Sequence, residues 1–238
     1  MDPASRLAPG FSWRVELINL FRFQRAPAAW LLSAGAVVLI TLAIDAICLA
    51  VGILRHNDAD KLFGEKTFGT YASVGLLISS GVVCFLTSRK VKGMPLEKFW
   101  FWWGVLLCFV TLDDLVKIHE QVDIAIHFIL GRDKNDPVTD HLDDLLLFAY
   151  TVPAAWLGLK NRQSVFKIRL MLQTLMIAFA FFVGMVACDF LGAPQSLEES
   201  FKLVADGFIL CAFLAPYLDP DLSRTGGGMI APSPASGA

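Results

Sequence analysis

The chain is short of charged residues. Only 18% of its 238 residues are Asp, Glu, Lys or Arg, whereas a soluble domain carries about a quarter. Soluble enzymes and disordered chains are therefore poor matches, because both need more charge. The net charge of -2 also disfavours nucleic acid as a partner, because proteins that bind phosphate carry a basic stripe.

Several sequence motifs that carry chemistry are missing. There is no glycine-rich loop that would cradle phosphate, no nucleophile elbow, no dinucleotide fingerprint and no His-Glu-x-x-His zinc motif. The five cysteines show no Cys-x-x-Cys spacing. We therefore expect them to be small buried apolar residues rather than a disulfide framework.

Long apolar stretches are what the chain has in abundance. Hydrophobic residues make up 55% of it, and the mean hydropathy is +0.59. A bilayer core needs about 20 helical residues to cross, and six stretches reach that length. The sequence predicts an all-α integral membrane protein with a bundle of six transmembrane helices. The predicted spans are residues 28–54, 68–88, 99–120, 141–159, 168–191 and 197–218.

The two ends of the chain differ from this pattern. In residues 1–27, aromatic and aliphatic side chains such as Phe11 and Trp13 alternate with arginines such as Arg14, which predicts an amphipathic helix lying in the membrane interface. Residues 219–238 are rich in Gly, Pro and Ser, which predicts a flexible tail. Pro153 interrupts the fourth span and is expected to kink it.

Basic residues predict the orientation. With the N-terminus on one side, 13 of the 20 lysines and arginines lie on that side of the six spans. By the positive-inside rule, both termini are therefore cytoplasmic. We expect the protein to reside in the plasma membrane, which is the inner membrane if the source is bacterial.

The acidic residues are placed on the opposite side. Of the 22 acids, 17 lie in outer loops or in the outer parts of the spans, and all four histidines lie there too. The inner halves of the spans have no ionisable residue. Because a charge within a span usually faces the bundle interior and has a partner, the sequence predicts an acidic site that opens outward above an apolar floor.

Helical spacing brings these polar residues together. Asp113, Glu120, Asp123 and His127 follow one another at seven, three and four residues, which places them on one face of a continuous helix, with His119 at its edge. Shared faces are also predicted in two other spans, by His141 with Asp144 and by Glu199 with Lys202 and Asp206.

Two lysines lie among the acids. Lys117 follows Asp113 by four residues, and Lys202 lies four residues from both Glu198 and Asp206. This spacing favours ion pairs within one helix, which would make the acids tolerable in the membrane. The alternative is a lysine poised for proton transfer or anion binding. Asp114 points away from the main polar face and is expected at the interface or against a neighbouring helix.

Imidazole and carboxylate groups together suit zinc, iron or manganese, and bundles of four helices can hold such ions. The usual Glu-x-x-His order of dimetal bundles is absent. The sequence predicts a divalent metal ion bound by a subset of His119, Glu120, His141, Asp144, Asp189 and Glu199. Asp113, Asp206 and Lys202 are the predicted catalytic acids and bases.

Three functions compete on this pattern. The first is a metal-dependent membrane enzyme, a hydrolase or oxidoreductase, that acts on a lipid or another amphiphile. The second is a cation or proton transporter or channel that uses the intramembrane acids. The third is a non-catalytic membrane subunit or assembly factor. The enzyme is favoured, because a transport path should continue through the inner half, where no ionisable residue lies.

Overall fold

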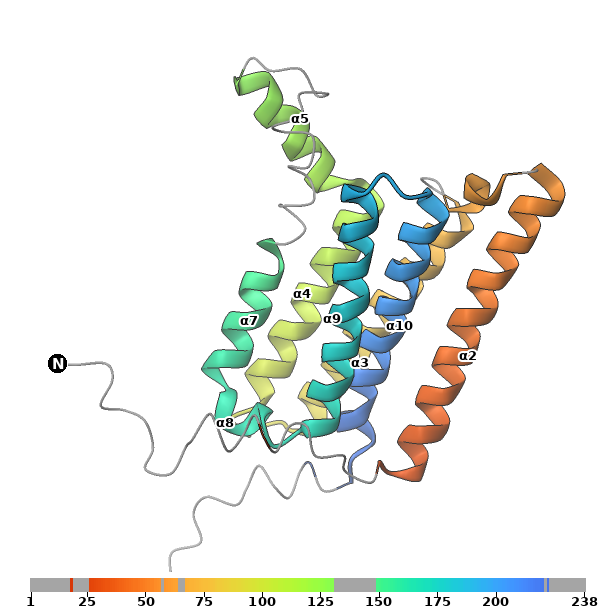
Figure 1. The fold of residues 1–238 in the computed structure, drawn as a ribbon. Coiled ribbons are helices and arrows are strands. Elements are labelled where there is room, and N and C mark those ends of the chain that lie inside the picture. The colour runs from red at the N-terminus through yellow and green to blue at the C-terminus, as the bar shows by residue number, and fades with distance from the viewer. Residues whose placement is uncertain are drawn as a thin grey trace, which may run out of the picture.

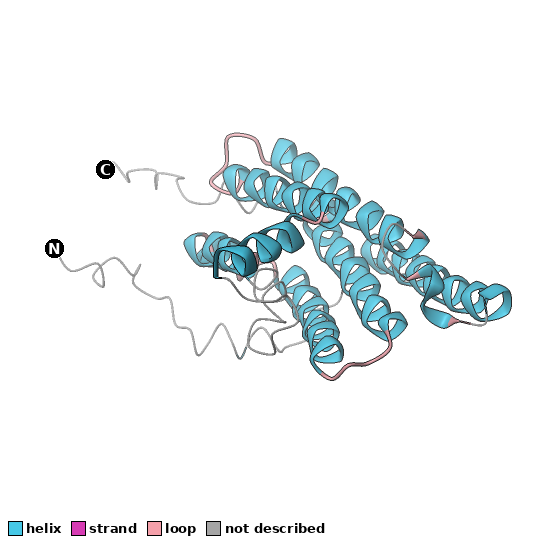
Figure 2. Cartoon of the chain, turned by 90° about the horizontal axis from the view of Figure 1, so that it is seen from above, coloured by secondary structure: helices cyan, strands magenta, loops and turns pink. Residues whose placement is uncertain are grey.

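The chain folds into a bundle of helices. The computed structural model describes residues 26–56, 58–63, 67–130 and 149–220, together with Ile18 and Leu222. Throughout these ranges the regular elements are helices, and no strand occurs among them (Figures 1 and 2).

Five helices are long and apolar enough to cross a membrane. They are α2 (Ala28–Val51), α3 (Phe68–Lys90), α4 (Glu97–Val116), α9 (Arg169–Phe190) and α10 (Gln195–Leu218). Shorter elements connect them: the π-helix η2 (Gly52–His56), the 3-10 helix η3 (Ala59–Leu62), α5 (Ile118–Leu130), α7 (Thr151–Lys160) and α8 (Arg162–Val165).

These five helices agree with five of the six predicted spans, with ends that shift by a few residues. The remaining span, residues 141–159, lies partly outside the described residues, and α7 covers its second half. Because α7 begins at Thr151, Pro153 lies in its first turn, where a missing N–H is tolerated. The predicted interfacial helix in residues 1–27 and the tail in residues 219–238 fall largely outside the described residues.

The predicted third span is not one continuous helix. Lys117 adopts the left-handed conformation with φ of 60°, and its N–H donates to the Asp113 carbonyl at 2.6 Å, which ends α4. The chain then starts α5 at Ile118, and Figure 1 shows α5 leaning away from the axis of α4. The prediction that Asp113 shares one helical face with Glu120, Asp123 and His127 is therefore wrong.

Helix α10 is the hub of the bundle. It packs against α9, α3 and α2, while α4 packs against α3 (Figure 1). In the most apolar 18-residue stretch of each helix, half or more of the residues are buried in α10 and α3, whereas only 17% are buried in α2. Most of α2 therefore faces away from the protein, as expected for a helix surrounded by lipid.

One end of the bundle is filled by aromatic rings, and we call it the aromatic end. It contains Phe99, Trp100 and Trp103 of α4 and Phe213 of α10, with the ring centres of Trp103 and Phe213 5.2 Å apart. The Lys90 ammonium closes this end by donating to the carbonyls of Tyr217 and Asp219 at 2.8 and 2.6 Å. This apolar packing agrees with the floor predicted from the sequence.

A glycine allows α2 to approach α10. The buried Thr41 side chain lies directly against Gly207, where an added Cβ atom would be 2.8 Å from Thr41 Oγ1 and 3.3 Å from Cγ2. Close approach through small residues is a common way for membrane helices to pack, because dispersion contacts replace the hydrophobic effect there.

This contact gives a stability prediction. Gly207→Ala should lower the free energy of unfolding by about 1–3 kcal/mol, because the new methyl group overpacks the contact with Thr41. The matched control is Gly75→Ala on α3, where an added Cβ meets nothing within 4 Å. Thermal unfolding in detergent compares the two variants, and equal midpoints would contradict the tight contact.

Candidate functional site

Polar side chains from several helices gather at the end of the bundle opposite the aromatic rings. We call this region the acidic end. It is built by the second half of α2, the first half of α3, the last turns of α4 and α9, and the first half of α10. Its members are Asp45, Ser73, Asp113, Asp114, Lys117, Asp189, Glu198, Glu199, Ser200, Lys202 and Asp206.

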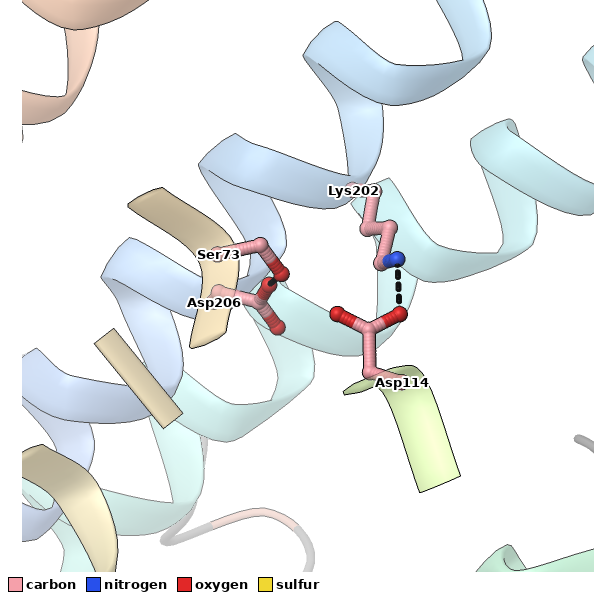
Figure 3. Close-up of polar contacts among 4 residues, drawn as sticks. All are labelled: Ser73, Asp114, Lys202 and Asp206. Atoms are coloured by element: carbon pink, nitrogen blue, oxygen red, sulfur yellow. Dashed lines mark hydrogen bonds and ion pairs between the residues drawn. The ribbon is translucent and has the colours of Figure 1, made fainter. Parts of the chain in front are cut away.

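An ion pair between Lys202 and Asp114 joins α10 to α4 at this end (Figure 3). The Lys202 ammonium donates to Asp114 Oδ1, and the two side chains are 23% and 10% exposed. Asp114 Oδ2 is buried and has no hydrogen-bond partner within the described part of the chain. One carboxylate oxygen is thus occupied by the lysine, and the other remains an acceptor.

A second contact joins α10 to α3 beside this pair. The Ser73 hydroxyl donates to Asp206 Oδ2 at 2.5 Å, and both residues are buried. Figure 3 shows the second oxygen of Asp114 pointing to the side on which Ser73 and Asp206 lie. Asp114 and Asp206, from α4 and α10, thus lie close enough to interact electrostatically with each other and with Lys202.

Further contacts fix the start of α10. The Ser200 hydroxyl donates to Asp45 Oδ1 of α2 at 2.6 Å. The Ser196 backbone N–H donates to Asp60 Oδ1 of η3 at 2.7 Å. Because the first N–H groups of a helix lack partners within it, a carboxylate from another element stabilises this terminus and its positive dipole end. These bonds hold the start of α10 against α2 and η3.

Asp113 is the most buried acid of the site, with 1% exposure. Tyr150, next to the start of α7, is close enough to interact electrostatically with it, and its ring packs against Phe109 of α4 with the ring centres 5.4 Å apart. Asp113 and Asp114 are adjacent in sequence but point in different directions, because neighbouring residues of a helix do not share a face. The end of α4 thus connects to both α7 and α10.

Negative charge predominates in this network. Lys202 interacts electrostatically with Glu199, Asp114 and Asp206, and Glu198 interacts with Asp189 and Lys117. Two lysines thus face a larger number of carboxylates. In a low dielectric such an excess is stable only when protons or other cations neutralise part of it.

The predicted catalytic residues Asp113, Asp206 and Lys202 all lie at the acidic end, as do the predicted ligands Asp189 and Glu199. The side chains of the other four predicted metal ligands are outside the part of the chain that the structure describes. The backbone of His119 and Glu120 is in α5 but their side chains are not described, and His141 and Asp144 are outside the described residues. Within the described ranges, no group of three His, Cys, Asp or Glu residues could hold a metal ion.

Sequence reasoning missed the main connections between helices. Lys202 forms its ion pair with Asp114 of α4, and not within its own helix as its spacing to Glu198 and Asp206 favoured. The expectation that Asp114 contacts a neighbouring helix is confirmed. Ser73 and Ser200 were not predicted. Their only signal is that a hydroxyl in an apolar helix can partner a buried acid on another helix.

One family model covers most of the chain. It is described as a domain of unknown function, DUF8692, and it matches residues 30–216. The chain belongs to the DUF8692 family. The matched range reaches from α2 to the last turn of α10 and so includes the whole acidic end. Comparisons with curated proteins and with solved structures gave no match.

The Lys202–Asp114 pair can be tested by a double-mutant cycle. Lys202→Met should lower the free energy of unfolding by about 3 kcal/mol, because it leaves the Asp114 carboxylate without its ion-pair partner. Asp114→Asn should lower it by less, because Lys202 keeps Glu199 and Asp206 nearby. The double variant should lose much less than the sum of the two. Chemical denaturation in detergent measures all four proteins. Strict additivity would show that the two groups do not interact.

Proposed function

We propose that this chain is a membrane-embedded enzyme that acts on a lipid or another amphiphile from the outer side of the membrane. Its active site is the acidic end. Asp113 and Asp206 serve as proton donors or acceptors, and Lys202 transfers a proton or binds an anionic group.

The observation that best supports this proposal is the chemical difference between the two ends of the bundle. Buried carboxylates reach inward from one end, with Asp206 near the middle of α10. Toward the other end, the aromatic rings around Trp100 and Phe213 fill the interior of the bundle. A polar site closed on one side suits chemistry on a substrate that enters and leaves from the other side, whereas a conduit needs polar groups throughout.

The orientation follows from the charges of the loops. Residues 91–96 and 161–168, which connect the helices at the aromatic end, contain or border most of the basic residues between the spans. By the positive-inside rule this end faces the cytoplasm, so the acidic end opens outward at the level of the lipid headgroups. The protein then resides in the plasma membrane, or in the inner membrane if it is bacterial.

The excess of carboxylates supports a bound divalent cation. Zinc, iron or manganese would be held by a subset of His119, Glu120, His141, Asp144, Asp189 and Glu199, which mix imidazole and carboxylate groups. Such an ion, when bound, would supply an activated water or dioxygen for hydrolysis or oxidation. The open oxygen of Asp114 and the neighbouring Asp206 then provide proton acceptors.

Metal content tests this assignment. Elemental mass spectrometry of the protein purified in detergent should find about one or two equivalents of zinc, iron or manganese. The Glu120→Ala/Asp144→Ala double variant should lose the metal, since it lacks two of the proposed ligands. Glu65→Ala, which removes an acid outside the proposed set, should keep it. Metal-free wild-type protein, or full metal in the double variant, would contradict the proposed centre.

Turnover tests the enzyme itself. Purified protein in vesicles of a total lipid extract should produce a new lipid species that mass spectrometry detects. Lys202→Met and Asp206→Asn should each lower its rate by roughly 100-fold or more, because each removes a group that moves a proton. Lys160→Met, which changes an exposed lysine at the aromatic end, should leave the rate unchanged.

The same vesicles separate the competing functions. If the protein forms no product but conducts protons or cations in an Asp206-dependent manner, it is a transporter or channel. If it shows neither activity and copurifies with a stoichiometric partner, it is a non-catalytic subunit.

A further inference from the structure

One cation and two carboxyl groups meet inside the acidic end (Figure 3). The Lys202 ammonium forms its ion pair with Asp114 of α4. Asp206 lies one turn after Lys202 on α10, and the Ser73 hydroxyl donates to its Oδ2 at 2.5 Å. Within the described part of the chain, Asp206 forms no ion pair. The lysine of this group is thus already taken by one of the two acids.

The groups around Asp206 do not compensate a negative charge on it. Ser73 of α3 is neutral, Asp114 of α4 is an acid, and Glu199 of α10 itself is another acid that interacts with Asp206. Lys202 is the one cation that interacts with Asp206 among the described residues, and its ammonium is bound by Asp114. Negative charge therefore predominates around Asp206.

The other ionisable groups of the acidic end are engaged elsewhere. Asp45 of α2 accepts from Ser200, and Asp189 of α9 interacts with Glu198. Lys117, the second lysine of this end, also interacts with Glu198. The helices that pack on α10 thus bring further acids to this end, but no cation that pairs with the carboxyl group one turn after Lys202.

Burial makes an uncompensated carboxylate costly at this position. Asp206 is 6% exposed and Ser73 only 1%, so water does little to stabilise a charge there. A carboxylate that is taken out of water without a cation becomes neutral by binding a proton. The second carboxylate nearby, on Asp114, favours the neutral form further, because two like charges in a low dielectric repel each other.

A separate feature of Asp114 points to the same proton. Its Oδ2 is buried and has no hydrogen-bond partner within the described residues, and Figure 3 shows this oxygen pointing to the side on which Asp206 lies. Buried acceptors normally have a donor. An ionised carboxylate at Asp206 would offer none, whereas a carboxylic acid carries an O–H. Because Ser73 already donates to Oδ2 of Asp206, this O–H belongs on Oδ1.

We propose that Asp206 holds a proton in the resting protein at neutral pH. The buried group then consists of one ion pair, Lys202 with Asp114, and one neutral carboxylic acid. This inference rests on the proposed function for the use of the proton: the O–H bond of Asp206 breaks, the proton passes to a basic atom of the substrate, and the remaining carboxylate later accepts a proton. Asp114 is a positioning residue, because it keeps the Lys202 ammonium away from Asp206.

Infrared spectroscopy tests this protonation state, because a carboxylic acid absorbs above the amide I band and a carboxylate does not. The full chain is measured at neutral pH in dodecyl maltoside, a detergent without a carbonyl group. Subtracting the Asp206→Asn spectrum from that of the wild type should leave one carboxylic acid band, which shifts to lower frequency in heavy water. Asp58→Asn changes an exposed acid of the loop before η3 and should leave the band in place.

Two further variants test how the ion pair controls the proton. Asp114→Asn should remove the Asp206 band although Asp206 is still present, because Lys202 is then free to pair with Asp206 and stabilise its carboxylate. Lys202→Met should instead keep that band and add a second one of about equal area, because Asp114 loses its cation and binds a proton as well. A spectrum that is unchanged in both variants would contradict the role of Asp114.

A difference spectrum without a carboxylic acid band would overturn the proposal. If Asp206→Asn fails to elute as a folded protein, Ser73→Ala provides a second readout. It should move the band to higher frequency, because the Asp206 carbonyl loses its hydrogen bond, and a band that stays in place would contradict the assignment. The turnover assay keeps the two proposals separate. Asp206-dependent turnover without the band would reject only the bound proton, and the band without turnover would reject only the enzyme.

Discussion

The ion pair between Lys202 and Asp114 is the constraint on which the rest of the bundle depends. A lysine and a carboxylate among helices apolar enough to cross a membrane are each costly alone, and they become tolerable when they meet. Because the two residues belong to α10 and α4, which also meet through the rings of Trp103 and Phe213 at the aromatic end, their pairing fixes how these helices face across the acidic end. The other polar contacts are arranged around this pair.

Helix α10 shows how one sequence can meet several demands. Lys202 and Asp206 lie one turn apart and face α4 and α3, respectively, while Ser200 and Gly207 face α2. A central helix with a polar stripe on one face and small residues on another can bury ionisable groups and still pack closely on three neighbours. The aromatic contacts of Phe213 then pack the second half of the helix against α4.

The predictable part of this structure is the part that depends on local composition. Apolar length located five spans, and the one-sided distribution of acids located the acidic end, because both are properties of single segments. The break at Lys117 was not predictable, since a left-handed lysine has no distinct signal in a single sequence. The partner of Lys202 was also missed. Spacing along a helix favours neighbours four residues away, whereas the choice of Asp114 depends on how two distant segments pack.

Helix α2 is less deeply buried than the other long helices of the bundle. A helix that only had to complete a bundle would bury more of its surface, yet α2 leaves most of its apolar face uncovered and stays apart from α9. It touches α10 at three levels, through the Trp30 indole with the Cys211 carbonyl, through Thr41 against Gly207 and through Asp45 with Ser200. These contacts attach α2 to α10 along most of its length and leave its other faces uncovered.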